Sequence, residues 1–222
     1  MKVLTLDVGG THVKMALSGS EEVRKFESGP ALTAQQMVEG VVRATSDWNY
    51  DAVSIGYPGP VVRGRIVHEP KNLGTGWVGF DFAARFGKPV KLLNDAAMQA
   101  LGSYDGGTML FIGLGTGMGS ALVIDNMVAP LELAHLPYRK RKTYEDYVGL
   151  RGLERLGKKR WQVFVEDVVA RLKAALVADS VVIGGGNAKK LRRVPPGARL
   201  GDNSHAFIGG FRMWQEGSST SL

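Results

Sequence analysis

Two glycine-containing turns, about a hundred residues apart, are the features of this chain that most clearly could do chemistry. Gly9, Gly10 and Thr11 separate two apolar runs, and a second turn, residues 115–119, separates two more. Glycine lets backbone N–H groups approach phosphate oxygens without interference from a Cβ atom, and such turns bind anions. Two turns of this kind, one on each half of a protein, could hold one polyphosphate from opposite sides.

Apolar runs on either side of the first turn, residues 3–8 and 12–17, predict a β-hairpin. The pattern restarts with residues 108–114 and 120–124 around the second turn, which indicates an internal duplication. Between the hairpins, alternating periodicity predicts helices and strands in turn. These are a helix over 33–46, a strand over 52–56, a loop over 57–60, a helix over 80–86, a strand over 89–93 and a helix over 96–101.

The last third of the chain predicts a basic helical region over 144–178 and a strand over 181–183 that ends in Gly184, Gly185 and Gly186. A break at the sequence PPG, residues 195–197, precedes a short helix near 205–215, and the tail GSSTSL is expected to be flexible.

The composition excludes several classes of protein. The chain has 222 residues, a net charge of +7 and no cysteine, which excludes disulfides and cysteine-rich zinc sites and favours a reducing cytoplasm. No stretch approaches the ~20 apolar residues of a membrane span. Basic clusters at 139–142, 158–160 and 189–193 indicate either a solvated surface or an anionic partner. No nucleic-acid-reading motif accompanies them, so we expect no nucleic-acid partner.

Five motifs in order carry a resemblance to a known family: DVGGTHVKMAL (7–17), LNDAAMQALG (93–102), GLGTGMGSALV (113–123), ELAH (132–135) and VVIGGG (181–186). Together they resemble the ROK family of sugar kinases in the actin and hexokinase superfamily. The stretch that begins at 113 is most similar to its polyphosphate glucokinase branch. The resemblance implies an α/β, two-lobe actin-like (ribonuclease H-like) fold with duplicated mixed sheets flanked by helices. It also implies a small first lobe, 1–95 plus 205–222, a larger lobe, 96–204, and possibly a homodimer.

By this resemblance both glycine turns bind the phosphates of the donor. The implied contacts are Gly9, Gly10, Thr11 and Lys14 on one side and Gly115, Thr116, Gly117 and Gly119 on the other, with Gly184, Gly185 and Gly186 on the nucleotide side. Asp7 is similar to the aspartate that helps to hold Mg²⁺ through water, a role that suits a hard cation. Read locally, Asp7 could instead be an exposed residue beside a plain hairpin turn, and the three glycines could be only a connection between strand and helix.

Asp95 resembles the catalytic aspartate that accepts the proton of the attacking sugar hydroxyl. Read locally, it could instead be a helix N-cap. Sugar hydroxyls each donate and accept a hydrogen bond, and the resemblance assigns Asn72, Asn94, Asp95, Glu132, His135 and Glu145 to their recognition. Asn72 could also be a turn residue, and Glu145 a carboxylate at a helix start. Ala134 stands where the family has the glycine of its E-x-G-H signature.

The resemblance implies a kinase for a hexose, glucose first, that uses Mg²⁺ and either ATP or inorganic polyphosphate. A sugar-responsive regulator is the alternative, although the first phosphate motif begins at Asp7 and leaves no room before it for a DNA-binding helix-turn-helix. A kinase for another acceptor, such as an amino sugar, is a third possibility. Because the chain lacks the family's cysteines, we expect no structural zinc and assign His135 to the sugar. His12, His68 and His205 receive no functional role.

Overall fold

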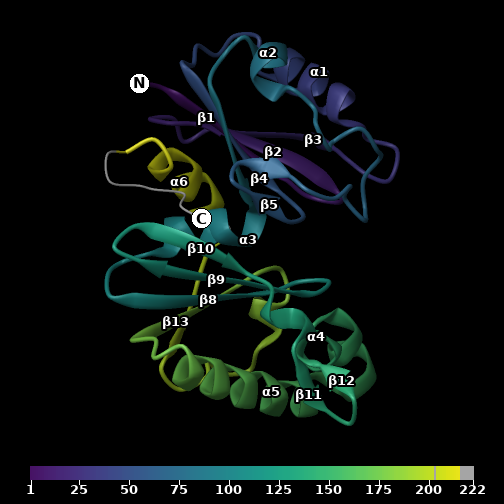
Figure 1. Ribbon diagram of the computed structural model, residues 1–222, viewed down its shortest axis with the longest axis vertical. Coiled ribbons are helices and arrows are strands. Elements are labelled where there is room, and N and C mark those ends of the chain that lie inside the picture. The colour runs from purple at the N-terminus through teal and green to yellow at the C-terminus, as the bar shows by residue number, and fades with distance from the viewer. Residues whose placement is uncertain (203, 216–222) are drawn as a thin grey trace.

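Two five-stranded sheets of one plan form the frame of the molecule in the computed structural model, which describes residues 1–202 and 204–215 (Figure 1). The first has the order β3-β2-β1-β4-β7 and the second β10-β9-β8-β13-β14. In each sheet the first three strands are antiparallel, and the last two run parallel to the middle strand. The first sheet consists of β1 (Val3–Val8), β2 (His12–Leu17), β3 (Val23–Glu27), β4 (Ala52–Tyr57) and β7 (Val90–Asn94). The second consists of β8 (Thr108–Leu114), β9 (Met118–Ile124), β10 (Met127–Leu131), β13 (Ser180–Gly184) and β14 (Ala198–Leu200).

The repeated topology confirms the predicted α/β class and the duplicated mixed sheets. Both predicted hairpins are present: β1 and β2 pair from Leu4 opposite Leu17 to Val8 opposite Val13, and β8 and β9 pair across the second turn. Two small hairpins were not predicted. They are β5 (Val61–Val62) with β6 (Arg65–Ile66), and β11 (Pro137–Arg139) with β12 (Lys142–Thr143).

Helices cover the outer face of each sheet (Figure 1). Helix α1 (Ala34–Ala44) starts with a capping box formed by Thr33 and Gln36 and buries Met37, Val38 and Val41 in the core of the first sheet. Helix α2 (Phe82–Phe86) adds its two phenylalanines to that core. Helices α4 (Tyr144–Val148) and α5 (Leu150–Ala175) pack on the second sheet, together with the 3₁₀ turns η1 (Leu133–His135) and η2 (Ala188–Lys190).

Helices α3 (Asp95–Ser103) and α6 (His205–Arg212) lie between the two sheets (Figure 1). Glycines let them approach each other closely: a Cβ atom added to Gly102 would be 1.8 Å from the His205 carbonyl oxygen, and one added to Gly209 would be 1.8 Å from that of Met98. Helix α6 also packs against β1 and β4, while α3 contacts both sheets. The start of α3, where Asp95 lies, is therefore positioned by elements from both halves of the chain.

The region predicted as helical over 144–178 is divided. Helix α4 ends before Gly149, and α5 contains a kink at Gly157, whose φ of 69° and ψ of 158° are not helical. The proposed lobe division at residues 95 and 96 stays a prediction. Residues 203 and 216–222, which include the tail GSSTSL, lie outside the described residues. Among the helices of the described part, none has the length and apolar character to cross a bilayer.

Candidate active site

The first glycine turn is held from several sides. The Gly9 amide donates to the His12 carbonyl at 3.0 Å and closes the turn between β1 and β2. Ser28, which follows β3, donates its hydroxyl to the Gly9 carbonyl at 2.6 Å. Asn72 lies on another side, because a Cβ atom added to Gly10 would be 3.2 Å from the Asn72 Cβ. The predicted sugar residue Asn72 is thus a neighbour of the predicted phosphate turn, where Gly10 is exposed.

Asp7 lies near the end of β1, directly across the hairpin from Lys14. The Lys14 Nζ is 3.7 Å from Asp7 Oδ2, and the Asp7 side chain is 25 % exposed. Burial raises the pKa of Asp7, while the charge and hydrogen bond of Lys14 oppose that rise. Asp7 is therefore a carboxylate whose charge its protein neighbours only partly offset, which differs from a fully solvated residue beside a turn.

Asn94 is the N-cap of α3, which corrects the local alternative that gave this role to Asp95. The Asn94 Oδ1 accepts from the Ala97 amide at 3.2 Å, and Nδ2 donates to the Gly59 carbonyl at 3.0 Å. Asp95 occupies the next position, the first of the helix. Its Oδ1 accepts from the Ala96 amide at 2.7 Å, and no side chain of the described residues donates to it. Asn94 thus leaves the Asp95 carboxylate available for a ligand.

The electrostatic surroundings of Asp95 favour its protonated form. Burial, then the negative charge of Asp7 and finally that of Glu132 raise the pKa of Asp95 to about 7, against the opposing Ala96 hydrogen bond. Asp7 from the first sheet and Glu132 from the side of the second are therefore near enough to Asp95 for their charges to act on it. A perturbed pKa beside other carboxylates is typical of acid–base sites.

The second hairpin lies directly against the start of α3. A Cβ atom added to Gly119 would be 2.7 Å from the Ala96 Cβ, so only glycine allows this approach. Gly119 lies in β9 rather than in the turn, which ends before Met118. Its observed role is thus to bring Asp95 close to the second turn, residues 115–117.

The three-glycine run supports this second turn from behind. The Gly115 amide donates to the Gly117 carbonyl at 3.1 Å, and Asn187 Nδ2 donates to the Gly115 carbonyl at 2.8 Å. Gly185 has a φ of 84°, and a Cβ atom there would be 2.5 Å from the Leu114 carbonyl oxygen. The predicted nucleotide-side glycines and the second turn therefore form one unit, to which Asn187 belongs although the sequence did not single it out.

Glu145 contacts the second turn rather than the first. A Cβ atom added to Gly117 would be 2.2 Å from Glu145 Oε2, and the Leu150 amide donates to the Thr116 carbonyl at 3.1 Å. The other oxygen, Oε1, is 3.3 Å from Arg151 Nη2. The starts of α4 and α5 thus lie at the turn, and Arg151 is a neighbour of the site that sequence reasoning missed because only the fold brings it there.

Glu132 and His135 lie beside β9 at the rim of the site. The Ser120 hydroxyl donates to the Leu131 carbonyl at 2.9 Å and accepts from the Leu133 amide at 3.3 Å, which fixes the start of η1. The His135 Nε2 is 3.8 Å from Glu132 Oε2, and the two side chains are 63 % and 67 % exposed. Two exposed polar groups one helical turn apart are free to bind a ligand.

All three histidines without an assigned role make internal hydrogen bonds. The His68 carbonyl accepts from the Tyr57 hydroxyl at 2.9 Å, and the His205 Nδ1 is 2.9 Å from the Ser103 hydroxyl. His12 contributes its carbonyl to the first turn.

Asp7 and Asp95 fit the chemistry of a Mg²⁺ site. Both carboxylates have a raised pKa, and the charge of Asp7 contributes to the shift at Asp95. A divalent cation between them would remove this repulsion, and Mg²⁺ accepts one or two carboxylates while it keeps most of its waters. The donor set therefore suits a hydrated hard cation.

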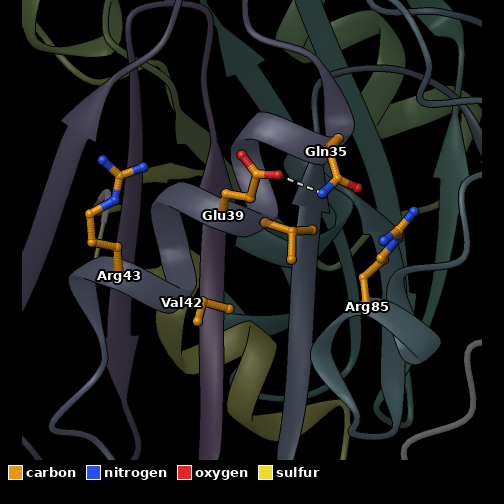
Figure 2. Close-up of a pocket in the computed structure, with 6 residues that line it drawn as sticks. Gln35, Glu39, Val42, Arg43 and Arg85 are labelled. Carbon is orange, nitrogen blue, oxygen red and sulfur yellow. Dashed lines mark hydrogen bonds between the residues drawn. The ribbon is translucent and has the colours of Figure 1, made fainter.

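A surface hollow on the far side of the first sheet carries none of these residues. It is lined by α1 and α2 through Gln35, Glu39, Val42, Arg43 and Arg85, among others, and Gln35 donates to Glu39 at 2.6 Å within it (Figure 2). The candidate site is defined instead by the convergence of the two turns on Asp95.

Similarity to known proteins agrees with this geometry. The model of the ROK family matches residues 3–130. A polyphosphate glucokinase from Mycobacterium leprae (strain TN) is 22 % identical over 213 residues, which cover 86 % of this chain, and the chain spans 65 % of the length of that relative.

Solved structures share the fold. The inorganic polyphosphate/ATP-glucomannokinase from Arthrobacter sp. strain KM superposes with a TM-score of 0.77 at 24 % identity, over 94 % of this chain and 96 % of its own. A ROK family glucokinase from Streptomyces griseus, in complex with glucose and AMPPNP, gives a TM-score of 0.76 at 17 % identity, over 95 % and 98 %. The family model covers more than half of the residues, and its match includes both glycine turns. The chain therefore belongs to the ROK family.

Proposed function

We propose that this protein is a sugar kinase that transfers a phosphoryl group from ATP or inorganic polyphosphate to a hydroxyl of a hexose, with glucose as the first candidate. The observation that carries the proposal is the position of Asp95 between two glycine turns. Its carboxylate has a pKa of about 7 and, among the described residues, accepts no hydrogen bond from a side chain. Its relatives named above support both donors and the hexose acceptor, since they are a polyphosphate glucokinase, a polyphosphate/ATP-glucomannokinase and a glucokinase.

In the proposed reaction Asp95 accepts the proton of the sugar hydroxyl while the hydroxyl oxygen attacks the terminal phosphorus of the donor. The bond between that phosphorus and the bridging oxygen breaks, and the shortened donor keeps the electron pair. Phosphoryl transfer depends mainly on position and electrostatics. Backbone amides of Gly10 and Thr11 on one side and of residues 115–117 on the other would bind the phosphate oxygens, and Lys14 would add a positive charge.

Mg²⁺, when bound, would offset negative charge on the transferring phosphoryl group. Asp7 would hold it through water, and the neighbouring Lys14 would limit the affinity of Asp7 for any cation. Loss of repulsion from Asp7 would also lower the pKa of Asp95 toward a more readily ionised base.

Polar groups around Asp95 would bind the sugar. Asn72, beside Gly10, and Asn94, next to Asp95, would contact the sugar from the side of the first sheet, and Glu132 with His135 from the side of the second. Opposite sides of one hexose ring would then bind to different sheets. Glu145 remains a proposed sugar ligand of the same set, and its contact with Gly117 would link sugar binding to the donor turn.

The test is a matrix of sugars against ATP and polyphosphate, with wild-type protein and Asp95→Asn. We expect hexose phosphorylation by the wild type, a kcat about 10²- to 10⁴-fold lower in the variant, and retained sugar binding by calorimetry. Because transfer needs the ionised carboxylate, the wild-type kcat/KM should fall about tenfold per pH unit below pH ~7. Asp125→Asn, an exposed change in the β9–β10 turn, is the control.

Near-normal turnover in Asp95→Asn would sink the assignment of the base. Glucose binding by the wild type without turnover from either donor would favour the sugar-responsive regulator instead. Turnover confined to an amino sugar would favour a kinase for that acceptor.

A further inference from the structure

The positive charge of this chain is concentrated in one segment. Residues 139–160 contain nine lysines and arginines against three acidic residues, a net charge of +6 where the whole chain carries +7. All nine cationic side chains are exposed. The segment comprises the β11–β12 hairpin, α4 and the start of α5, which lie together at one end of the molecule (Figure 1). The charge is therefore a local surface feature rather than an even background.

The three-dimensional arrangement gathers several of these cations around α4. Arg151 Nη2 is 3.9 Å from Asp146 Oδ1, and Arg155 Nη2 donates to the Asp146 carbonyl at 2.8 Å. Hydrogen bonds from Thr143 lower the pKa of Asp146, and the charges of Arg151 and Lys142 add smaller contributions in the same direction. Lys158 and Lys159 come directly after the kink at Gly157, and both are exposed. We call these five side chains the basic strip: Lys142, Arg151, Arg155, Lys158 and Lys159.

Acidic neighbours, among them Glu145, Asp146 and the exposed Glu154, neutralise only part of the strip. Asp146 Oδ2 accepts from both the amide and the hydroxyl of Thr143, at 2.9 Å each, as part of the capping box of α4. Glu145 faces Gly117 as well as Arg151. Lys158 and Lys159 form no ion pair or side-chain hydrogen bond with the described residues. The strip therefore retains an excess of positive charge for an external anion.

The basic strip begins at the second glycine turn. Leu150, next to Arg151, donates its amide to the Thr116 carbonyl, and Glu145 connects Gly117 to Arg151. A linear anion with one end at residues 115–117 would thus leave the turn beside Arg151 and pass Arg155 next.

We propose that the basic strip binds the distal part of an inorganic polyphosphate chain whose terminal phosphate lies in the second glycine turn. The proposal rests on the proposed function and adds to it the surface that follows the donor outward. A polyphosphate chain carries the same anionic group at every unit, so it can repeat one charge-pairing contact along a row of cations. ATP instead ends in an uncharged base, which cannot make that contact.

The aromatic residues of this region argue against nucleic acid as the ligand. Base recognition by single-strand binders uses exposed aromatic faces. Here Tyr138, Tyr144, Tyr147 and Phe164 pack against one another, with ring centroids 4.7–6.3 Å apart, and Tyr147 is buried beneath Arg155, whose guanidinium carbon is 5.1 Å from the ring centroid. Three of these rings are partly buried in their own cluster, and the fourth lies beneath a cation of the strip, so none presents a fully exposed face to a base.

The test variant is Arg155→Gln/Lys158→Gln/Lys159→Gln, which removes three charges and spares Arg151 beside the turn. The matched control is Arg43→Gln/Arg85→Gln/Lys88→Gln, which removes three exposed charges at α1 and α2, on the opposite end of the molecule (Figures 1 and 2). Fluorescence anisotropy with labelled long-chain polyphosphate measures binding without turnover. Kinetics with long-chain polyphosphate, tripolyphosphate and ATP measure donor use.

We expect the test variant to bind long-chain polyphosphate about tenfold more weakly or worse. The slope of log affinity against log salt should be shallower by about 2–3, because each phosphate contact that is lost removes about one released counterion from the binding reaction. The KM for ATP and tripolyphosphate should be unchanged, and the control should behave as the wild type.

Unchanged binding of long-chain polyphosphate by the test variant would overturn the proposal, as would equal losses in test and control variants. Loss of RNA binding with intact polyphosphate binding would assign the strip to nucleic acid and also overturn it. If the wild type phosphorylates no sugar with any donor, the proposed function fails, while anisotropy still decides whether the strip binds polyphosphate.

Discussion

Replacement of Asp95 by asparagine should stabilise the protein at neutral pH while it abolishes transfer. The folded state raises the pKa of Asp95 from 3.8 to about 7. At pH values between these two, the folded protein therefore keeps a proton on Asp95 that the unfolded chain has lost. Wild-type stability therefore falls as pH rises from about 4 to 7, and the penalty is complete above that range. Asparagine carries no charge and keeps an oxygen for the Ala96 amide, so the variant escapes the penalty.

The size of the effect follows from the shift. A change of about 3 pKa units corresponds to about 4 kcal/mol at most. Solvent contact of a partly exposed carboxylate reduces this value, and loss of a negative charge from the first turn of α3 costs about 0.3–1 kcal/mol. We expect a net gain of about 1–2 kcal/mol at pH ~8, which raises Tm by about 2–8 °C for a chain of this length.

Thermal unfolding of wild type and Asp95→Asn in buffer with a chelator, from pH ~4.5 to ~8, measures this difference. The gain should grow with pH and should be small at the acidic end, where the wild-type carboxyl is itself protonated. Asp125→Asn reports the effect of one surface charge lost elsewhere. A gain that is independent of pH, or a variant less stable than wild type at pH ~8, would refute the claim that Asp95 is held in a charge-repelling site.

Two glycine substitutions test how the site is positioned. In Gly117→Ala the new Cβ would meet Glu145 Oε2 at 2.2 Å, so we expect the carboxylate to move and kcat/KM to fall about tenfold, with a stability change below about 1 kcal/mol by urea unfolding; an unchanged kcat/KM would separate Glu145 from the donor turn. In Gly209→Ala the Cβ would be 1.8 Å from the Met98 carbonyl oxygen, so α3 and α6 must separate, and stability should fall by about 1–3 kcal/mol. Gly186→Ala, where no atom lies within 4 Å, is the control for stability alone, and equal losses of stability in Gly209→Ala and Gly186→Ala would contradict the close helix contact.

Local pattern was sufficient to predict both hairpins and their duplication, because alternating apolar runs around a glycine turn specify a strand pair without help from distant residues. The same holds for α1, where Thr33 and Gln36 mark the start in the sequence itself. Edge strands β3, β10 and β14 were missed, since at most one residue of each is buried. Their pairing depends on the neighbouring strand more than on their own composition.

The site was predictable as a set of residue types but not as a set of contacts. Asn94 and Asp95 are adjacent, both favour helix N-caps, and only the position of the first helical turn decides that Asn94 takes that role. Glu145 could not be assigned to the second turn from sequence, because nearly thirty residues of hairpin and 3₁₀ turn lie between them. Asn187 donates to the backbone of that turn, and Arg151 pairs with Glu145 beside it, and no local motif marks such contacts.

The position of Asp95 at the start of α3 would couple the proposed catalysis to the packing of helices and sheets around it. Gly119 brings the second sheet to Ala96, and Gly102 and Gly209 bring α6 to α3, at distances that any side chain would prevent. Helix α6 in turn packs on β1, the strand that carries Asp7. Asp95 directly follows β7, a strand of the same sheet as β1, so a movement of the second sheet relative to the first would change the distance between Glu132 and Asp95 rather than that between Asp7 and Asp95. The part of the Asp95 pKa that repulsion from Glu132 sets would change with it. In the proposed kinase, closure around a sugar and a donor would adjust the base at the same moment as it brings the two phosphate turns together.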